Sequence, residues 1–287
     1  MPRELILLTN DDGIRSRGLW AAAQALQPLG ELLVIAPDRQ WSGGGRSMPH
    51  HSSGKLQPTA LWINGERVAA YAVDASPAQA VVHGLLEVAD RPPALVVSGI
   101  NHGANLGLEV TISGTVGAAL EAGAFGIPSM AVSLEMDPTQ EMTGDEPGDT
   151  TAAIAITRRL AGCILGTLLP PDVDVLNVNV PADASPQASI RVTRLSRRRY
   201  YLPRIPERCR NGEKSGYQQI ADYQEAEPDS DVWVVKVGGD VSVTPLSLDL
   251  TARLDLRQLG YHLSVGLCRQ PQAARSQVEV ASPEPVK

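Results

Sequence analysis

Three features that mark large classes of protein are missing from this sequence. None of the apolar runs in its 287 residues approaches the roughly 18 residues that cross a bilayer, and the apolar stretch near the N-terminus is too short for a signal peptide. Lysine and arginine total 25 against 32 aspartates and glutamates, a net charge of −7 that argues against the broad basic face of a nucleic-acid-binding protein. A hydrophobic content of 43% excludes disorder of the whole chain. We therefore expect a cytoplasmic globular protein that binds neither membranes nor nucleic-acid polymers.

Cysteine is scarce, and the usual metal and nucleophile motifs are missing. The three cysteines, Cys163, Cys209 and Cys268, are far apart and form no CxxC pair, so the sequence predicts neither a zinc cage nor a disulfide framework. The five histidines form no HxxxH or HExxH pattern, and no GxSxG sequence is present. These absences argue against a zinc peptidase and a serine hydrolase.

The first 185 residues alternate short apolar runs with helix-like segments. Residues 4–9 and 32–36 are typical of buried parallel strands, and the alanine- and leucine-rich segment 18–29 between them predicts a helix. Further strands are expected at 94–97, 129–134 and 173–178, and further helices from Ser76-Pro77, from Gly114 and over 149–169. This order favours an α/β fold with a mostly parallel sheet.

Outside that rhythm, the sequence predicts a hairpin and a C-terminal extension. Residues 62–68 predict a hairpin around Asn64-Gly65, a pair that tolerates the positive φ of a tight turn. After residue 185 strand-like pieces stand at 232–237 and 241–244. Eight arginines cluster there, at positions 191, 194, 197, 198, 199, 204, 208 and 210. We expect a catalytic core over 1–185, an extension with an arginine-rich arm over 186–269, and a loose tail over 270–287.

Three polar loops each follow a predicted parallel strand: Asn10–Gly13, Ala36–Gly45 and Ser98–Asn105. Ligands of open α/β sheets bind beyond the carboxyl ends of the strands, so the three loops are expected at one binding edge. The adjacent Asp11 and Asp12 would repel each other unless a cation lay between them, and Mg²⁺, Mn²⁺ and Ca²⁺ prefer oxygen ligands. The alternative is an ordinary turn in which these side chains cap backbone amides.

Two further segments carry groups suited to an anion. The glycines after Ser42 let a backbone approach a ligand closely, although a glycine run is also typical of a plain surface loop. Ser113-Gly114-Thr115 begins a helix of small residues, where free N–H groups and the helix dipole favour negative charge. An ordinary helix N-cap explains the same residues, and both readings stay open at this point.

Taken together, these motifs resemble those of one family, and the resemblance runs from about residue 4 to 255. They are Asn10-Asp11-Asp12-Gly13, Ala36-Pro37 with Ser42-Gly43, Ser98-Gly99-Ile100-Asn101, Ser113-Gly114-Thr115-Val116-Gly117-Ala118-Ala119, Gly126-Ile127-Pro128, Leu176-Asn177-Val178-Asn179-Val180-Pro181 and Val243-Thr244-Pro245-Leu246. The chain is similar to the SurE (survival protein E) family of metal-dependent nucleotidases. The resemblance implies a Rossmann-like three-layer α/β/α core with a C-terminal β-rich extension that joins subunits into homodimers or homotetramers.

The resemblance also implies an activity and a site. The family removes phosphate from nucleoside 5′- and 3′-monophosphates, and some members trim short polyphosphate. One divalent metal ion per subunit, Mg²⁺ or Mn²⁺ with Ca²⁺ as the alternative, is implied on Asp11, Asp12, Ser42 and Asn101. Phosphate contacts are expected from Asn10, Gly43, Asn101, Ser113, Gly114 and Thr115. The chain departs from the family pattern at Ala75–Gln79, Glu109 and Ile112, which leaves base preference and subunit contacts open.

The sequence thus predicts a phosphomonoesterase in which Asp11 and Asp12 hold the metal and act in catalysis. One of them, or hydroxide on the metal, would be the base. Two rivals remain. A zinc amide deacetylase also places paired aspartates after its first strand, but it needs histidine ligands. A non-catalytic nucleotide or metal sensor could keep the anion-binding helix start at Ser113-Gly114-Thr115 without hydrolysing a substrate.

Overall fold

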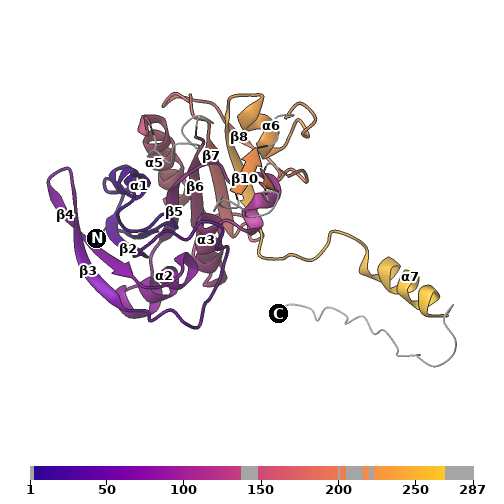
Figure 1. The fold of residues 1–287 in the computed structure, drawn as a ribbon, viewed down its shortest axis with the longest axis horizontal. Coiled ribbons are helices and arrows are strands. Elements are labelled where there is room, and N and C mark those ends of the chain that lie inside the picture. The colour runs from indigo at the N-terminus through magenta and orange to yellow at the C-terminus, as the bar shows by residue number, and fades with distance from the viewer. Residues whose placement is uncertain (1–2, 137–147, 200, 205–215, 220–222, 269–287) are drawn as a thin grey trace, which may run out of the picture. The chain divides into compact units, whose positions relative to one another are not determined.

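The fold is built on a nine-stranded sheet (Figure 1). The computed structural model describes residues 3–136, 148–199, 201–204, 216–219 and 223–268. The strands lie in the order β3-β4-β2-β1-β5-β6-β7-β11-β8. Their bounds are β1 Leu5–Thr9, β2 Glu31–Pro37, β3 Leu56–Ile63, β4 Glu66–Val73, β5 Leu95–His102, β6 Ser129–Leu134, β7 Val175–Val180, β8 Ile190–Val192 and β11 Val241–Leu246. A separate antiparallel pair joins β9 Tyr201–Arg204 to β10 Gly216–Gln219.

The centre of the sheet is parallel and contains a topological switch point. β1 pairs in parallel with β2 on one side and with β5 on the other. The chain runs outward from β1 through β2 to the β3–β4 hairpin, then returns to add β5, β6 and β7 on the opposite side. Loops that leave β1 and β5 therefore diverge at their carboxyl ends, where open α/β sheets bind ligands.

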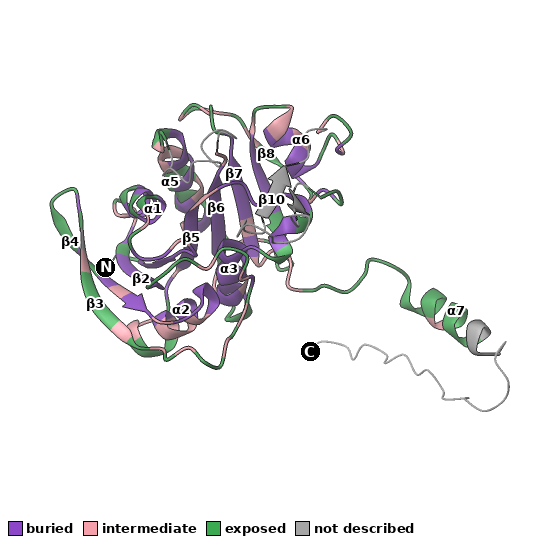
Figure 2. Ribbon diagram, in the orientation of Figure 1, coloured by how far each residue is buried: buried purple, intermediate pink, exposed green. Residues whose placement is uncertain are grey.

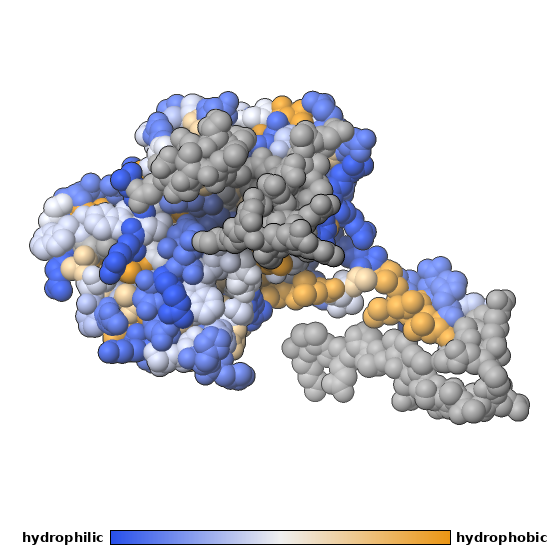
Figure 3. All heavy atoms as spheres, viewed as in Figure 1, coloured by the Kyte–Doolittle hydropathy of each residue, from blue (hydrophilic) through white to orange (hydrophobic). Residues whose placement is uncertain are grey.

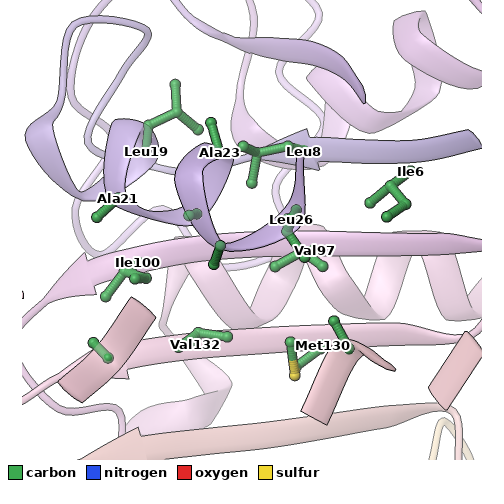
Figure 4. Close-up of a cluster of buried hydrophobic side chains, with 14 of the residues drawn as sticks. Ile6, Leu8, Leu19, Ala21, Ala23, Leu26, Val97, Ile100, Met130 and Val132 are labelled. Carbon is green, nitrogen blue, oxygen red and sulfur yellow. The ribbon is translucent and has the colours of Figure 1, made fainter. Parts of the chain in front are cut away.

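Helices cover both faces of the sheet and make three layers (Figures 1 and 2). They are α1 Arg17–Leu26, α2 Pro77–His83, α3 Gly114–Ala124 and α5 Thr151–Leu165, with the short η1 Gly84–Val88 and η2 Gly107–Thr111. One buried cluster joins β1 to α1 and α5, and Figure 4 shows Leu8 among the α1 side chains there. A second cluster joins β1 to α2 and α3. Alternate residues of β1 thus serve opposite clusters, Ile6 and Leu8 in the first and Leu5 and Leu7 in the second.

The local signals at the hairpin and at α2 are confirmed. The turn between β3 and β4 has positive φ at Asn64 (50°) and Gly65 (83°), as the Asn-Gly pair predicts. At the start of α2 the Ser76 hydroxyl accepts from the Gln79 N–H at 3.1 Å, and the Gln79 side chain accepts from the Ser76 N–H at 3.1 Å. This capping box satisfies two amide groups that the helix itself leaves unpaired.

The strand predicted over 232–237 is wrong, because this segment forms helix α6, Asp231–Lys236. Its valines favour a strand by propensity. A capping hydroxyl before the segment and the packing of two valines on one face favour a helix instead. The Ser230 hydroxyl caps the helix by accepting from the Trp233 N–H. Val232 and Val235 lie three positions apart and pack together with Leu106, a spacing that a helix places on one face.

The C-terminal part of the chain divides at residue 248. β8 and β11 belong to the main sheet, where β11 pairs antiparallel with β7, and residues 1–248 form one compact unit. The second unit, 249–287, contains α7 (Leu256–Cys268). This helix exposes Leu256, Leu259 and Leu263, whose spacing suits one helix face (Figure 3). The predicted tail over 270–287 lies outside the described residues.

Among the residues that the structure describes, no helix has both the length and the apolar content needed to cross a bilayer.

The Asp231 side chain binds two loops that are distant from each other in the sequence, so its loss should destabilise the fold. Its fully buried carboxylate accepts from the Gly107 N–H at 2.8 Å and from the Ser196 N–H at 2.9 Å. Asp231→Ala should lower the free energy of unfolding by about 2–3 kcal/mol, because buried N–H groups lose their acceptor. Denaturant titration measures this. The control Asp240→Ala, which removes a surface carboxylate 3.9 Å from Arg191, should change it by less than about 0.5 kcal/mol. Equal effects would contradict this account.

Candidate active site at the carboxyl edge of the sheet

The turn after β1 is closed by Asn10. The buried side chain of Asn10 accepts from the Gly13 N–H and donates to the Gly13 carbonyl, both at 3.1 Å, and Gly13 has a φ of 96° that favours glycine. This closure presents Asp11 and Asp12 on a tight turn rather than along a strand. The predicted phosphate contact of Asn10 stays a prediction, because both polar groups of its side chain already serve the turn.

The carboxylate of Asp11 is buried against the start of α3. The Thr115 hydroxyl donates to Asp11 Oδ1 at 2.5 Å, and only 4% of Asp11 is exposed. Gly114 permits this approach, since a Cβ at that position would lie 2.7 Å from Asp11 Oδ2. The pKa of Asp11 is raised to about 6, because burial and, to a smaller extent, the charge of Asp12 raise it by more than the hydrogen bond from Thr115 lowers it. Thr115 therefore touches a predicted metal ligand, whereas the sequence predicts its hydroxyl at the phosphate.

Asp12 lies between the loops that follow β2 and β5. The Gln40 side-chain nitrogen lies 3.4 Å from Asp12 Oδ1 and 2.9 Å from Ser42 Oγ, so one amide group bridges two predicted metal ligands. The other carboxylate oxygen, Oδ2, lies 3.5 Å from the His102 backbone nitrogen. Burial raises the pKa of Asp12, although these hydrogen bonds act in the opposite direction. Gln40 is a site residue that the sequence analysis missed, because an exposed glutamine in a loop gives no distinctive signal.

Asn101 stands at the end of β5, beyond a bulge that shifts the pairing with β6 between Ser98 and Asn101. Its side-chain nitrogen donates to the carbonyls of His102 (3.3 Å) and Gly103 (2.8 Å). These bonds fix the amide so that its oxygen is the group left for a ligand. The structure thus brings the loops of Asp12, Ser42 and Asn101 to one edge.

A buried asparagine network holds the loop that follows Asn101. The Asn105 N–H donates to Asn179 Oδ1 at 2.7 Å, and the side chains of Asn177 and Asn179 donate to the Asn105 carbonyl at 2.9 and 3.1 Å. Asn177 and Asn179 are fully buried in β7. Two asparagines at alternate positions in an apolar strand share one face, and this spacing is the signal that could have predicted the contact.

The first turn of α3 lies beside the aspartates. The Ser113 hydroxyl accepts from the Val116 N–H at 3.1 Å and caps the helix, so the N-cap interpretation of Ser113 is confirmed. N–H groups in a first helical turn have no partner within the helix, and Gly114 in this turn lies against Asp11. Beside Gly43 a Cβ would meet no atom within 4 Å, which leaves room for a ligand near Ser42.

These donors fit a hard divalent cation. The set consists of two carboxylates, a hydroxyl and an amide oxygen, the ligand types that Mg²⁺, Mn²⁺ and Ca²⁺ prefer. A buried carboxylate next to a half-buried one, both with raised pKa values, is costly until a cation compensates their charge. Within the described ranges, no three His, Cys, Asp or Glu side chains group in a way that could hold a metal. That finding gives no support to a histidine-ligated zinc centre.

Part of the arginine cluster is paired within the chain. Arg191 lies 3.9 Å from Asp240, Arg194 lies 2.8 Å from Asp229, and Arg198 lies 2.5 Å from Glu225. These arginines thus pair with acidic side chains of their own chain. Arg208 and Arg210 lie outside the described residues.

Fold and site together define an α/β protein with a cluster of oxygen donors at a topological switch point. The family model described as "Survival protein SurE" matches residues 6–202. The chain is 43% identical to the 5'-nucleotidase SurE of Thermococcus gammatolerans, over 88% of this chain and 94% of the relative. It is 42% identical to the 5'-nucleotidase SurE of Archaeoglobus fulgidus, over 87% and 94%. The SurE crystal structure from Aquifex aeolicus superposes with a TM-score of 0.70 at 33% identity, covering 90% of this chain and 99% of that one. The chain belongs to the SurE family.

The burial of Asp11 predicts a pH dependence of stability in the absence of divalent cations. Unfolded Asp11 ionises from about pH 4, whereas folded Asp11 holds its proton to about pH 6. Because its pKa is raised on folding, the folded protein loses stability as the pH rises through this window. Relative to an Asp11→Asn variant, the chelated protein should lose up to about 3 kcal/mol between about pH 4 and pH 7.

Urea titrations of both proteins across this pH range measure the difference. Added Mn²⁺ should then stabilise the parent protein more than Asp11→Asn, because only the parent keeps the carboxylate. Parallel pH profiles of the two proteins would show that Asp11 does not carry the effect.

Proposed function

We propose that this protein is a divalent-metal-dependent phosphomonoesterase that hydrolyses nucleoside 5′-monophosphates to nucleoside and phosphate. The observation that carries the proposal is the contact between Asp11 and Thr115 at the start of α3. It joins a pair of buried carboxylates, which need a cation, to a helix N-terminus, which favours an anion. A phosphate monoester bound there would meet both. The two nucleotidases named above support the substrate class.

Asp11, Asp12, Ser42 and Asn101 would hold the metal ion in this proposal. When bound, the ion supplies Lewis-acid polarisation of phosphate and lowers the pKa of its water. The Gly114 N–H at the helix end meets the non-bridging oxygens of phosphate, where charge is redistributed in the transition state. Asp12, which is less buried than Asp11 and has a raised pKa, is positioned to take a proton from the attacking water.

Finer features complete the proposal. We include hydrolysis of nucleoside 3′-monophosphates and short polyphosphate, with one Mg²⁺ or Mn²⁺ ion per subunit and Ca²⁺ as the alternative. A homodimer or homotetramer is also part of it, since the leucines of α7 are exposed in the single chain. The family resemblance and the all-oxygen donor set support these points.

The metal dependence is tested by phosphate release from AMP. After chelation the protein should release no phosphate, and Mn²⁺ or Mg²⁺ should restore release better than Zn²⁺, because all donors are oxygens. Selective restoration by Zn²⁺ would favour a zinc hydrolase. Binding of AMP without release under any metal would favour the sensor, and full activity of the metal-free protein would remove the metal from the mechanism.

Asp12→Asn tests the carboxylate while preserving side-chain shape. We expect kcat for AMP to fall by about 10² or more at saturating Mn²⁺, the scale on which preorganised electrostatic groups act. Asp90→Asn changes an exposed carboxylate paired with Arg91 and should leave kcat unchanged. A near-normal kcat in Asp12→Asn would exclude Asp12 from the reaction.

A further inference from the structure

One face of α3 contacts two of the three loops that carry predicted metal ligands, the loop of Asp11 and the loop of Ser42. Gly114, Gly117 and Glu121 are three and four positions apart, the spacing of neighbours on a helix face. Gly114 lies against Asp11, as described above. Gly117 lies against the loop after Ser42: a Cβ there would come within 2.5 Å of the Gly45 carbonyl carbon and oxygen. The missing side chains of both glycines therefore let the helix touch the two loops directly.

Glu121, one turn further along α3, forms an ion pair with Arg46 of the loop that follows Ser42. Arg46 Nε lies 2.6 Å from Glu121 Oε2, with 10% of the Glu121 side chain and 38% of the Arg46 side chain exposed. A carboxylate this buried is costly without a partner, so the pair constrains where Arg46 lies. The Gly45 N–H also donates to the Ile112 carbonyl at 2.9 Å, just before the α3 cap.

Apart from the Gln40 amide, which lies 2.9 Å from Ser42 Oγ, the residues next to Ser42 do little to fix its position. The next three residues are glycines, and Gly43 and Gly45 have positive φ values of 75° and 54°. Glycines offer no side chain to fix a loop and leave its backbone permissive. On the other side, the Trp41 N–H donates to the Asp11 carbonyl at 2.7 Å. The position of Ser42 relative to the aspartates thus depends on that backbone bond, on the Gln40 amide between Ser42 and Asp12, and on the contacts of Gly45 and Arg46 with α3.

We propose that Glu121, through Arg46, is a positioning residue that sets Ser42 at coordinating distance from the aspartates. This inference rests on the proposed function, because it takes Ser42 as a metal ligand. Glu121 does not touch the metal or the substrate. Its role is to hold the loop of Ser42 against the same face of α3 that contacts Asp11. The ligands from these two loops then lie close enough to form one site.

The test measures Mn²⁺ binding to the chelated protein by calorimetry, without substrate, in parallel with thermal unfolding. Glu121→Gln keeps the side-chain shape and removes its charge. We expect its Kd for Mn²⁺ to rise about tenfold or more, as for other residues that orient metal ligands, with kcat for AMP at saturating Mn²⁺ within about twofold. Arg46→Met, at a partly exposed position, should give the same result and serves if Glu121→Gln does not fold.

Glu31→Gln is the matched control. It breaks the ion pair with Arg91 at the amino end of β2, the opposite edge of the sheet. It should leave the Kd for Mn²⁺ unchanged even where it lowers thermal stability. A merely structural role of Glu121 would lower the unfolding temperature and leave Mn²⁺ affinity within twofold of the parent, and that result would overturn the inference.

The outcomes also separate this inference from the proposed function. If the parent protein binds Mn²⁺ but releases no phosphate from AMP, the proposed function fails while the comparison of Mn²⁺ affinities still decides on Glu121. If the parent releases phosphate and Glu121→Gln binds Mn²⁺ as tightly as the parent, only the inference about Glu121 fails. If the parent does not bind Mn²⁺, both fail.

Discussion

The burial of the Asp11 carboxylate beside Asp12 is the constraint on which the rest of this site depends. A buried negative charge next to another carboxylate is unfavourable, and the raised pKa of Asp11 expresses that cost. The protein keeps it there with a turn closed by Asn10 and a hydrogen bond from Thr115. These contacts orient the charge but do not neutralise it. In the proposed site, a bound cation and the N-terminus of α3 would provide the compensation that the surrounding side chains lack.

The fold makes this arrangement possible through the position of β1. Its neighbours β2 and β5 lead the chain in opposite directions, so three loops meet where no strand connection crosses. The loop after β5 is irregular, so contacts from other elements must hold it in place. Asn177 and Asn179 do this from β7 by binding the Asn105 backbone, at the cost of polar groups in a buried strand. Hydrogen bonds from both asparagines to the same backbone carbonyl specify one position of the loop.

Much of this could be predicted from the sequence, because the decisive signals are local. Apolar runs, the Asn64-Gly65 turn and the capping box of Ser76 each act within a few residues, and the structure confirms them. Tertiary contacts decided the rest. The sequence of 232–237 favours a strand. The helix found there depends on contacts such as those of Asp231, which accepts from the N–H groups of Gly107 and Ser196, residues remote in sequence. The role of Gln40 likewise depends on two loops meeting.

The same distinction explains why sequence reasoning did not predict the contact of Thr115 with Asp11. A hydroxyl in the first turn of a helix suits an anion, and nothing local indicates that an aspartate 104 positions earlier lies within reach. Only the close approach that Gly114 permits turns that hydroxyl from a ligand contact into a support for a carboxylate. In this protein the helix N-terminus and the carboxylate pair are one unit, so an acidic chain can offer an anion a favourable place without a basic surface.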